Sequence, residues 1–374
     1  MKDNKYKYIH ILWANELKFN EPLVDLVNNP DNLLHPESTL IVTPHKHVFD
    51  GLNKYSNVVY DGSNRNLFNK YYSKNSWIIS HDFPNKKIGF TIFPWVKKRI
   101  VYRYWGGRRV FNESRSTTIA RKTYDFLVKQ LYSAAFRHIY DGMAAIGIAN
   151  VVDEYDLADL IKKTPFFRLS YKRNMDPSEF DKIRESAKLD DDKKLHVMVG
   201  HKSDLSLRHI HYLEVLKKYD ESLITIYLPL SYGDKEYAET IKKYIHDNNI
   251  QNVKIQSELM SYEQYLYYLN NIDIALIDCY NSFALGNIQL LLNLRKTLYL
   301  SRGGIIQKAF EKEKVPYRVL DEIENMDFEE FKDVLEISDS DIGEKLRFRT
   351  YAEGIDTWRD LYKYLDNKDN NGMR

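Results

Sequence analysis

Short apolar runs separated by polar, helix-like stretches make up most of the chain. An apolar run of about four to eight residues bounded by turn residues is typical of a buried strand, and apolar residues spaced three or four apart are typical of a helix. In the first half this pattern predicts a helix over 120–139. It predicts strands over 8–14, 39–44, 57–62, 76–81 and 142–150, the last followed by a further helix.

The second half repeats the alternation of strands and helices with more regularity. Such alternation favours a parallel sheet covered by helices, with right-handed crossovers between the strands. We therefore expect a Rossmann-like α/β domain in this half. The predicted strands are 195–200, 223–230, 252–256, 272–279 and 297–301, and the predicted helices are 206–218, 234–248, 261–271, 287–294 and 304–312.

The chain of 374 residues is too long for one ordinary hydrophobic core, so we expect two domains. The segment 171–194 is polar and rich in charge, which favours a linker between an N-terminal domain over 1–170 and a C-terminal domain over 195–343. Residues 344–366 are expected to form a C-terminal helix, one arrangement being its return to the N-terminal domain. Residues 367–374 are expected to be disordered.

Composition narrows the class of protein. Apolar residues make up 43% and charged residues 29%, a balance typical of a globular protein in water. No window approaches the roughly 18–20 apolar residues of a membrane span, and the net charge of +2 gives no argument for a nucleic-acid partner. Cys279 is the only cysteine, which excludes an internal disulfide and suits a reducing compartment. We expect a cytoplasmic protein.

Residues that follow strands are the first candidates for a site, because ligands of parallel α/β sheets bind beyond the carboxyl ends of the strands. After the first strand of the second half, Gly200 permits close approach of a ligand to the backbone, and Ser203 or Asp204 is able to cap the next helix. Tyr232 and Gly233 follow the next strand. Ordinary capped turns are the alternative interpretation of both loops.

Gly286 and Asn287 fall at the start of an almost wholly apolar helix in the same half. The first N–H groups of a buried helix need hydrogen-bond acceptors, and a diphosphate supplies them. The alternative is a cap from Asn281 or Ser282. The chain has neither a P-loop nor a complete G-x-G-x-x-G motif, which counts against nucleoside triphosphatases and dehydrogenases.

His81 and Asp82 stand at the carboxyl end of a predicted strand in the first half. A histidine there is suited to act as a general base near neutral pH, and Asp82 is the second candidate. The alternative is a loop histidine that hydrogen-bonds its neighbours, which is the more common case. The histidines within 35–47 lack the spacing of metal ligands, so we expect no metal site.

Residues 93–122 combine nine Lys or Arg and one Glu with interleaved tryptophan and tyrosine. Aromatic side chains beside cations suit an anionic membrane surface or the phosphates of a lipid headgroup. They also suit single-stranded nucleic acid, and a solvated basic face is the plain alternative. The density of tryptophan favours the membrane. The candidate acceptor or membrane contacts are Trp95, Arg103, Trp105, Arg108 and Arg109.

Several motifs, in order, resemble those of the bacterial transferases that add 4-acetamido-4,6-dideoxygalactose to a lipid-linked precursor of enterobacterial common antigen, glycosyltransferase family 56. The loop at 199–210 reads VGHKSDLSLRHI and resembles the family's V-G-N-S-x-D-x-S-x-x-H-I. Pro229 and Tyr232 match its P-M-x-Y. Two further stretches, YEQYLYYLNNIDIAL and ALGNIQLLL, are similar to Y-L-x-L-L-x-x-x-D and G-I-G-T-L-x-L-L. In the first half, SHDF, YWGGR and NMDPS correspond to H-G-Q-F, I-W-G-A-D and R-M-D-P-S.

The resemblance implies a GT-B fold, in which two Rossmann-like domains face each other across a cleft. It implies that the C-terminal domain binds a nucleoside-diphosphate sugar and that the N-terminal domain binds a lipid-linked acceptor. It also implies a reaction without metal or cofactor, in which a helix start and basic residues neutralise the diphosphate. Two positions depart from the family. Arg108 replaces the acid of W-G-A-D, and His201 replaces the asparagine after Val-Gly, which bears on the choice of sugar.

The resulting hypothesis is a peripheral glycosyltransferase on the inner face of the bacterial cell membrane. It would transfer a deoxyamino sugar or another hexose from a dTDP or UDP donor to a polyprenyl-diphosphate-linked saccharide of a surface polysaccharide. A sugar-nucleotide epimerase of the same architecture and a non-enzymatic binder of anionic polymer or nucleic acid are the alternatives. The expected donor-binding residues are Gly200, His201, Ser203, Asp204, Tyr232, Gly233, Asn281, Ser282, Gly286 and Asn287.

Overall fold

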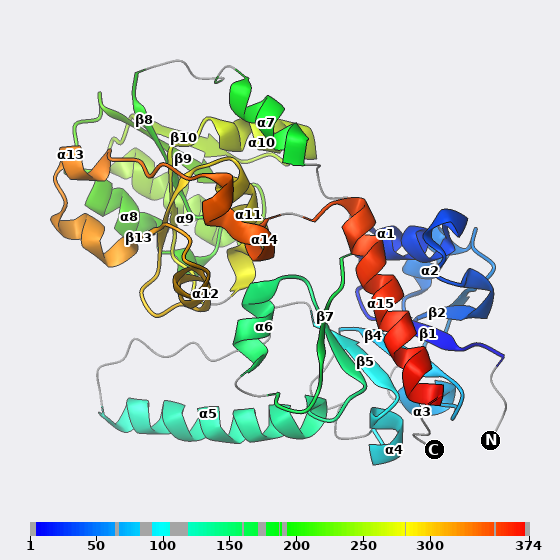
Figure 1. The fold of residues 1–374 in the computed structure, drawn as a ribbon. Helices are drawn as coiled ribbons and strands as arrows, with labels where there is room; N and C mark the ends of the chain where they lie inside the picture. Colours follow the sequence, from blue (N-terminus) through cyan, green and yellow to red (C-terminus); the bar gives the residue numbers. More distant parts are fainter. Residues whose placement is uncertain are drawn as a thin grey trace. The chain divides into compact units, whose positions relative to one another are not determined.

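The computed structural model describes residues 5–63, 67–82, 92–104, 119–158, 161–170, 177–186, 188, 193–280, 282–347 and 349–370. The chain forms two α/β units, each built on one parallel sheet (Figure 1). Unit 1 comprises Met1–Asn174 and Arg349–Arg374, and unit 2 comprises Met175–Phe348. The chain therefore passes from one unit to the other twice.

Unit 1 is built on a seven-stranded parallel sheet. Its strands are β1 (Tyr8–Leu12), β2 (Thr39–Thr43), β3 (Val58–Tyr60), β4 (Trp77–His81), β5 (Ile100–Arg103), β6 (Ala145–Ile148) and β7 (Phe166–Arg168). They lie in the order β3-β2-β1-β4-β5-β6-β7. The α-helices are α1 (Leu17–Asn28), α2 (Lys46–Leu52), α3 (Leu67–Tyr71), α4 (Pro94–Lys97), α5 (Ile119–Tyr140), α6 (Val151–Ala158) and α15 (Tyr351–Asn370).

The two faces of this sheet belong to different hydrophobic cores, because side chains alternate along each strand. Tyr8 of β1 packs in one core with Trp358 of α15, whereas Ile9 packs in the other with Phe136 of α5. The C-terminal helix therefore contributes to the core of the N-terminal unit. Figure 1 shows α15, in red, running alongside this sheet.

Unit 2 is built on a six-stranded parallel sheet in the order β10-β9-β8-β11-β12-β13. These strands are β8 (Leu195–Val199), β9 (Ile224–Pro229), β10 (Val253–Gln256), β11 (Ile274–Ile277), β12 (Thr297–Leu300) and β13 (Arg318–Val319). The α-helices are α7 (Pro177–Glu185), α8 (His209–Leu216), α9 (Lys235–Asp247), α10 (Tyr262–Asn270), α11 (Leu285–Asn293), α12 (Ile305–Glu313), α13 (Phe328–Phe331) and α14 (Asp339–Leu346).

The strands and helices predicted from the apolar runs are confirmed in both units, but β5, β7 and β13 were not predicted. Each of these three strands contains an arginine, Arg103, Arg168 or Arg318, which interrupts the apolar run. Strand β5 is also concealed by its surroundings. Its sequence IVYR lies within residues 93–122, the basic stretch, yet all four of its side chains are buried.

Two segments near the passages between the units differ from the expectation. The predicted linker contains α7, whose Phe180 is 1% exposed. The predicted helix over 344–366 is interrupted, because α14 ends at Leu346 and α15 begins at Tyr351. Helix α15 then continues to Asn370, beyond the predicted start of a disordered tail. Its Asp369 accepts a hydrogen bond from Trp77 Nε1 at 2.9 Å and pairs with Arg99, which holds this end on unit 1.

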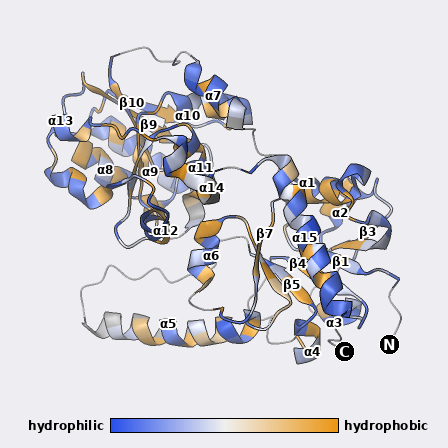
Figure 2. Ribbon diagram, in the orientation of Figure 1, coloured by the Kyte–Doolittle hydropathy of each residue, from blue (hydrophilic) through white to orange (hydrophobic). Residues whose placement is uncertain are grey.

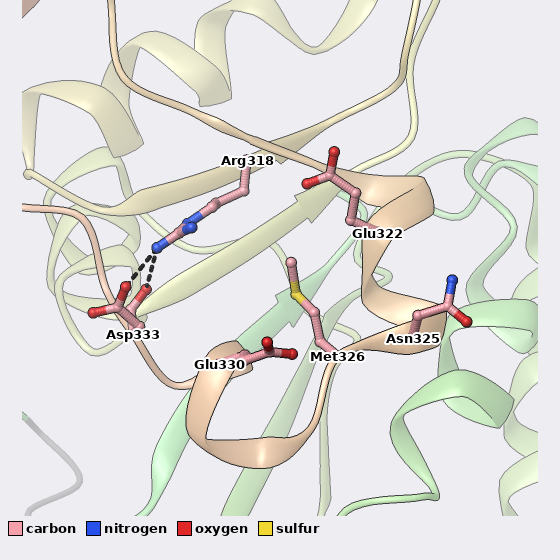
Figure 3. Close-up of a pocket in the computed structure, with 6 residues that line it drawn as sticks. All are labelled: Arg318, Glu322, Asn325, Met326, Glu330 and Asp333. Atoms are coloured by element: carbon pink, nitrogen blue, oxygen red, sulfur yellow. Dashed lines mark hydrogen bonds and ion pairs between the residues drawn. The ribbon is translucent and has the colours of Figure 1, made fainter.

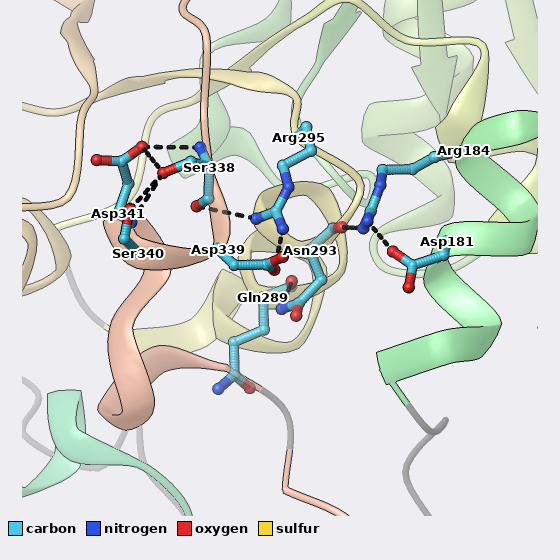
Figure 4. A network of polar contacts seen from close by, with 9 residues as sticks. All are labelled: Asp181, Arg184, Gln289, Asn293, Arg295, Ser338, Asp339, Ser340 and Asp341. Atoms are coloured by element: carbon cyan, nitrogen blue, oxygen red, sulfur yellow. Dashed lines mark hydrogen bonds and ion pairs between the residues drawn. The ribbon is translucent and has the colours of Figure 1, made fainter.

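The two elements of unit 2 that lie next to the passages, α7 and α14, are both tied to the end of α11 (Figure 4). Arg184 of α7 donates from Nη1 to the carbonyl oxygen of Asn293 at 2.7 Å. Arg295, two residues further on, donates from Nη1 to the Ser338 carbonyl at 3.2 Å and pairs with Asp339 of α14. The carboxyl end of α11 thus anchors both elements of unit 2 that lie next to the passages, α7 and α14.

Candidate active site

The loop after β8 depends on a glycine. Gly200 has a φ of 70°, in the left-handed region that side chains disfavour. A Cβ at this position would lie 2.4 Å from Nε2 of His209, the first residue of α8. The backbone at the carboxyl end of β8 therefore approaches α8 too closely for any other residue.

The loops after β8 and β9 are joined by a short parallel bridge between Ser203 and Gly233. The Ser203 N–H donates to the Tyr232 carbonyl at 2.9 Å, and the Asp234 N–H donates to the Ser203 carbonyl at 2.7 Å. Gly233 has a φ of 112°, and a Cβ there would lie 2.2 Å from the Ser203 carbonyl oxygen. The bridge thus brings two of the predicted donor loops together and explains the second glycine.

Asp204 caps a short 3-10 turn over Leu205–Leu207, and α8 begins only at His209. The carboxylate accepts the Ser206 N–H at 3.0 Å and pairs with Lys202 at 2.9 Å. Burial alone would raise the pKa of Asp204, but these hydrogen bonds lower it to about 2. The capping interpretation therefore holds for Asp204, although the capped element is not the predicted helix.

The start of α11 contacts the loop after β9 through Asn287. Tyr265 of α10 donates its hydroxyl to Asn287 Oδ1 at 2.7 Å, and Asn287 also hydrogen-bonds the half-exposed Tyr232 hydroxyl. The residue before α11 is Ala284, which supplies no side-chain cap. Gly286 is exposed, and a Cβ there would meet no atom within 4 Å among the described residues.

The predicted cap residues do not precede α11 directly. Ser282 belongs to a 3-10 turn over Ser282–Ala284 and is 9% exposed. Asn281 lies outside the described residues. The first turn of α11 is therefore reached through Ala284, and the interpretation of Ser282 as its cap is wrong.

An ion pair that the sequence analysis missed lies beside these loops. Asp278, directly after β11, is 2% exposed and pairs with Arg208, which precedes α8 in a left-handed conformation. Tyr212 and Ser301 donate hydroxyl hydrogen bonds to the same carboxylate at 3.2 and 2.8 Å. The guanidinium of Arg208 remains 30% exposed. An aspartate directly after a buried strand was the available signal.

Two buried histidines underlie the loop after β8. His201 is 2% exposed and His209 is fully buried. Nδ1 of His201 and both ring nitrogens of His209 have no hydrogen-bond partner among the described residues. Burial lowers the pKa of both histidines to about 4, so both are neutral at pH 7. His201, expected to contact the donor, is instead enclosed by the protein.

In unit 1 the carboxyl end of β4 carries His81, which is 1% exposed. Its Nε2 lies 3.0 Å from Nδ1 of His10, and Nε2 of His10 lies 2.9 Å from the Tyr362 hydroxyl of α15. Burial, together with His10 and Arg103, lowers the pKa of His81 well below its ordinary value. Nδ1 of His81 is buried with no partner among the described residues.

Asp82 follows His81 and is partly exposed. It has a φ of 71°, an uncommon conformation for a residue with a side chain. The Tyr102 hydroxyl donates to Oδ1 at 3.3 Å, and the Ser80 hydroxyl donates to the Asp82 carbonyl at 2.7 Å. The two predicted catalytic residues thus lie at one sheet edge with different exposure.

The basic stretch divides into buried and exposed residues. Arg103 is 5% exposed, and its guanidinium donates to the backbone carbonyls of Leu169 and Tyr104. Its predicted membrane contact is therefore wrong, because β5 places it inside unit 1. Trp95 of α4 is 56% exposed. Trp105, Arg108 and Arg109 lie outside the described residues.

A second buried charged group lies near Arg103. Asp153 of α6 is 2% exposed and accepts the Ala149 N–H at 3.3 Å. Burial raises the pKa of Asp153 to about 7, although the Arg103 cation acts in the opposite direction. Asp156 accepts the Tyr104 hydroxyl at 3.2 Å. These residues surround the carboxyl ends of β5 and β6, and no motif singled them out.

A hollow of about 490 Å³ lies elsewhere on unit 2 (Figure 3). Arg318 of β13 pairs there with Asp333 at 2.6 Å. The remaining lining residues carry two further carboxylates and no cation, which does not suit a diphosphate. None of the predicted donor residues lines this hollow. Its lining consists of Arg318, Glu322, Asn325, Met326, Glu330 and Asp333.

Two absences hold for the part of the chain that the structure describes. No group of three or more His, Cys, Asp or Glu is placed so that it could hold a metal ion. No helix combines the length and the apolar character needed to cross a membrane.

Comparisons with known proteins identify the fold. No curated protein sequence matched the chain. Anabaena Alr3699/HepE, solved in complex with UDP, has a TM-score of 0.58 and 10% identity, covering 98% of this chain and 100% of its own. The α,α-trehalose 6-phosphate synthase of Burkholderia multivorans has a TM-score of 0.56 and 9% identity, covering 99% and 100%. A glycosyltransferase from Rickettsia africae has a TM-score of 0.51 and 12% identity, covering 97% of each chain. The two parallel-sheet units form a GT-B fold.

One family model also matches the sequence itself. It describes 4-alpha-L-fucosyltransferases, glycosyl transferase group 56, and matches residues 96–360. This range includes residues from both units and covers most of the chain. The protein is therefore a glycosyltransferase and belongs to glycosyl transferase group 56.

Proposed function

We propose that this glycosyltransferase moves a deoxyamino sugar, or another hexose, from a dTDP or UDP donor to a polyprenyl-diphosphate-linked saccharide of a bacterial surface polysaccharide. Family membership supports the transfer of a sugar and counts against an epimerase or a non-enzymatic binder. Fucose is 6-deoxygalactose, so the family description also supports a 6-deoxy sugar.

The observation that carries the proposal is the convergence of three loops at the carboxyl edge of the unit 2 sheet. The bridge between Ser203 and Gly233 joins the first two loops, and the contact of Tyr232 with Asn287 joins the second to α11. Ligands of parallel sheets bind at this edge. A diphosphate at the start of α11 would accept hydrogen bonds from first-turn N–H groups that Ala284 leaves without a side-chain cap.

Positive charge beside these loops supports the same placement. Arg208 is held in a defined orientation by Asp278 while part of its guanidinium stays exposed. Lys202 lies in the loop after β8 and is 26% exposed. Both cations would offset the charge that develops on the leaving diphosphate. In this proposal the reaction needs neither a metal ion nor a cofactor, so EDTA would leave the transfer rate unchanged.

For the acceptor hydroxyl we propose Asp82 as the general base. A base has to come within hydrogen-bond reach of the proton that it removes. The partial exposure of Asp82 supports this role, whereas His81 is 1% exposed and contacts His10. His81 would act as a positioning residue beneath Asp82. The acceptor would bind unit 1. In this proposal the enzyme is a cytoplasmic protein that associates peripherally with the inner face of the cell membrane, and it has no nucleic-acid partner.

The test is the thermal midpoint of the purified full-length chain in the presence of dTDP, UDP or GDP. A ligand at a hundred times its Kd stabilises the folded state by about 2.7 kcal/mol, so a binding nucleotide raises the midpoint. We expect dTDP or UDP to do so and Gly286→Leu to abolish the rise, because the leucine would occupy the space beside the diphosphate. Thr240→Leu, at an exposed position of α9, is the control.

A midpoint unmoved by any of the three nucleotides at millimolar concentration would overturn the donor assignment. Sugar transfer to a short water-soluble saccharide at the same rate as to a lipid-linked saccharide would overturn the acceptor assignment alone.

A further inference from the structure

Helix α5 exposes large apolar side chains along its first part. Phe126, Leu127 and Leu131 are 58%, 56% and 73% exposed. The last turn behaves differently, since Phe136 and Ile139 are 3% and 4% exposed and belong to a core of unit 1. The helix is thus anchored at its carboxyl end and carries an exposed apolar surface toward its start.

Helical geometry makes these side chains contiguous. Leu127 and Leu131 are four residues apart, so they lie one above the other on one face. Phe126 is displaced from Leu127 by about 100° around the axis, so it borders the same face. Scattered single exposures are normal on a protein surface, but contiguous apolar residues mark a binding surface. Figure 2 shows hydrophobic and hydrophilic residues side by side along α5.

Helix α4 adds a second exposed apolar group near the carboxyl end of α5 (Figure 1). Phe93 and Trp95 are 47% and 56% exposed, and their rings stack at 4.8 Å between centroids. Lys97 donates from Nζ to the His138 carbonyl at 2.6 Å, which ties α4 to α5. Tryptophan and phenylalanine are the side chains favoured at the boundary between lipid and water.

The positive charge of α5 and of the residues around α4 favours an anionic partner. The sequence of α5 contains four Lys or Arg and one Asp. Arg137 of α5 and Lys98, directly after α4, are both exposed. A second copy of the chain paired through α5 would bring like charges together. An anionic bilayer would instead attract these cations. Apolar side chains with surrounding cations are the pattern of a helix that lies in a membrane interface.

We propose that the exposed face of α5, together with Phe93 and Trp95, docks on an anionic lipid bilayer. The helix would lie along the surface, because its charged residues and the absence of a membrane-crossing helix among the described residues do not suit insertion. This inference extends the proposed function, since it names the element that would bring unit 1 to a lipid-linked acceptor.

The test is flotation of the full-length protein with vesicles of phosphatidylglycerol and phosphatidylethanolamine, compared with vesicles of phosphatidylcholine alone. We expect binding to the anionic vesicles and a loss of at least about tenfold in the variant Leu127→Ser with Leu131→Ser. Both positions are exposed, so the variant retains its fold. Leu259→Ser, which changes a leucine of unit 2 that is 78% exposed, is the matched control.

The outcomes separate this inference from the proposed function. Vesicle binding that is unchanged in the α5 variant, or equal for both vesicle types, overturns the docking role. A variant that instead dissociates an oligomer in sedimentation velocity assigns the face to a second copy and also overturns it. A wild-type chain that binds dTDP or UDP but not vesicles leaves glycosyl transfer in place without α5 docking. A chain that binds anionic vesicles but no nucleotide leaves the docking role of α5 in place and overturns the donor assignment.

Discussion

At the scale of single residues, the backbone of Asp82 has the clearest bearing on catalysis. Its φ of 71° lies in a region that is strained for most side chains and that aspartate tolerates better than most. The Asp82 N–H donates to the Arg103 carbonyl at 3.1 Å, and its carbonyl accepts the Ser80 hydroxyl. These hydrogen bonds hold the backbone of Asp82 in this conformation. The backbone conformation in turn sets the direction of the carboxylate. Conformations of this kind concentrate at functional sites.

We expect Asp82→Asn to lower kcat by about a hundredfold or more, because the amide cannot accept the acceptor's proton. His81→Ala is expected to lower kcat less and to destabilise unit 1, since it removes a buried ring that contacts His10. Steady-state kinetics with circular dichroism of each variant distinguishes the two effects. Asp50→Asn, at an exposed position of α2, serves as the control.

The reverse order of effects would assign the role of general base to His81 instead of Asp82. That outcome would be near-normal turnover in Asp82→Asn together with a hundredfold loss in a folded His81→Ala variant.

At the scale of elements, α11 joins two features of unit 2. Its amino end meets the loop after β9 through Asn287, and its carboxyl end accepts Arg184 at the Asn293 carbonyl. The amino end has no side-chain cap, which leaves its N–H groups for a ligand or water. Glycine at position 286 is not required by the fold, because its φ is not in the left-handed region and the space beside it is open.

Gly286→Ala therefore distinguishes the effect of this position on helix stability from its effect on donor binding. Alanine is the better helix former, so the free energy of unfolding of the variant should be about 0.5–1 kcal/mol higher than that of the wild type. The added methyl group stands where the diphosphate would approach, so the nucleotide Kd should rise by about tenfold. Urea unfolding and isothermal titration calorimetry measure the two quantities on the same protein.

A Gly286→Ala variant with unchanged nucleotide affinity would move the diphosphate away from this turn. Gly200→Ala is the contrasting variant, because the 2.4 Å approach of His209 predicts lower stability there.

At the scale of the whole molecule, each unit encloses a pair of histidines with lowered pKa values. Burial lowers the pKa of His10 to about 3 and holds that of His81 well below its ordinary value. In unit 2 burial lowers the pKa of His201 and His209 to about 4. All four are neutral when folded near pH 7, and each takes up a proton more readily when unfolded.

The fold should therefore become less stable as the pH falls below about 6.5. Between the folded and unfolded pKa values the unfolded chain binds more protons, so the free energy of unfolding rises with pH in this window and levels off above about 6.5. Each histidine contributes up to about 1.4 kcal/mol per pH unit. Urea unfolding at a series of pH values measures the slope, and constant stability from about pH 7 to pH 5 would contradict it.

His246→Asn is the control for this prediction, because it replaces a histidine that is 89% exposed on α9 rather than a buried one. A buried-site variant such as His10→Gln should reduce the slope by the share of one histidine.

The periodicity of the chain was sufficient to predict most strands, because a strand such as β8 or β11 is buried on both faces and reads as a continuous apolar run. It was not sufficient for β5, whose buried Arg103 donates hydrogen bonds to the carbonyls of Leu169 and Tyr104. That compensation comes from residues far along the chain or outside the strand. Local charge therefore concealed a strand that tertiary hydrogen bonds make possible.

For the candidate site, position after a strand was a good guide to location but not to environment. Tyr232, Gly233 and Asn287 lie together as their positions after strands suggested. His81 and His201 lie at strand ends too, yet both are buried. His10 of β1 and Trp358 of α15 lie against the ring of His81. Exposure depends on elements that pack from elsewhere in the chain.

The sequence by itself determined two parallel-sheet units, the position of the strand-end loops and the family, because these depend on local periodicity and on ordered motifs. Only the tertiary structure decided which strand-end residues are buried, which loops are joined and what α15 covers. Such facts depend on contacts between segments as distant as His10 and Tyr362, and no local pattern records them. The ion pair of Arg208 with Asp278 and the exposed face of α5 likewise became visible only once the helices were packed.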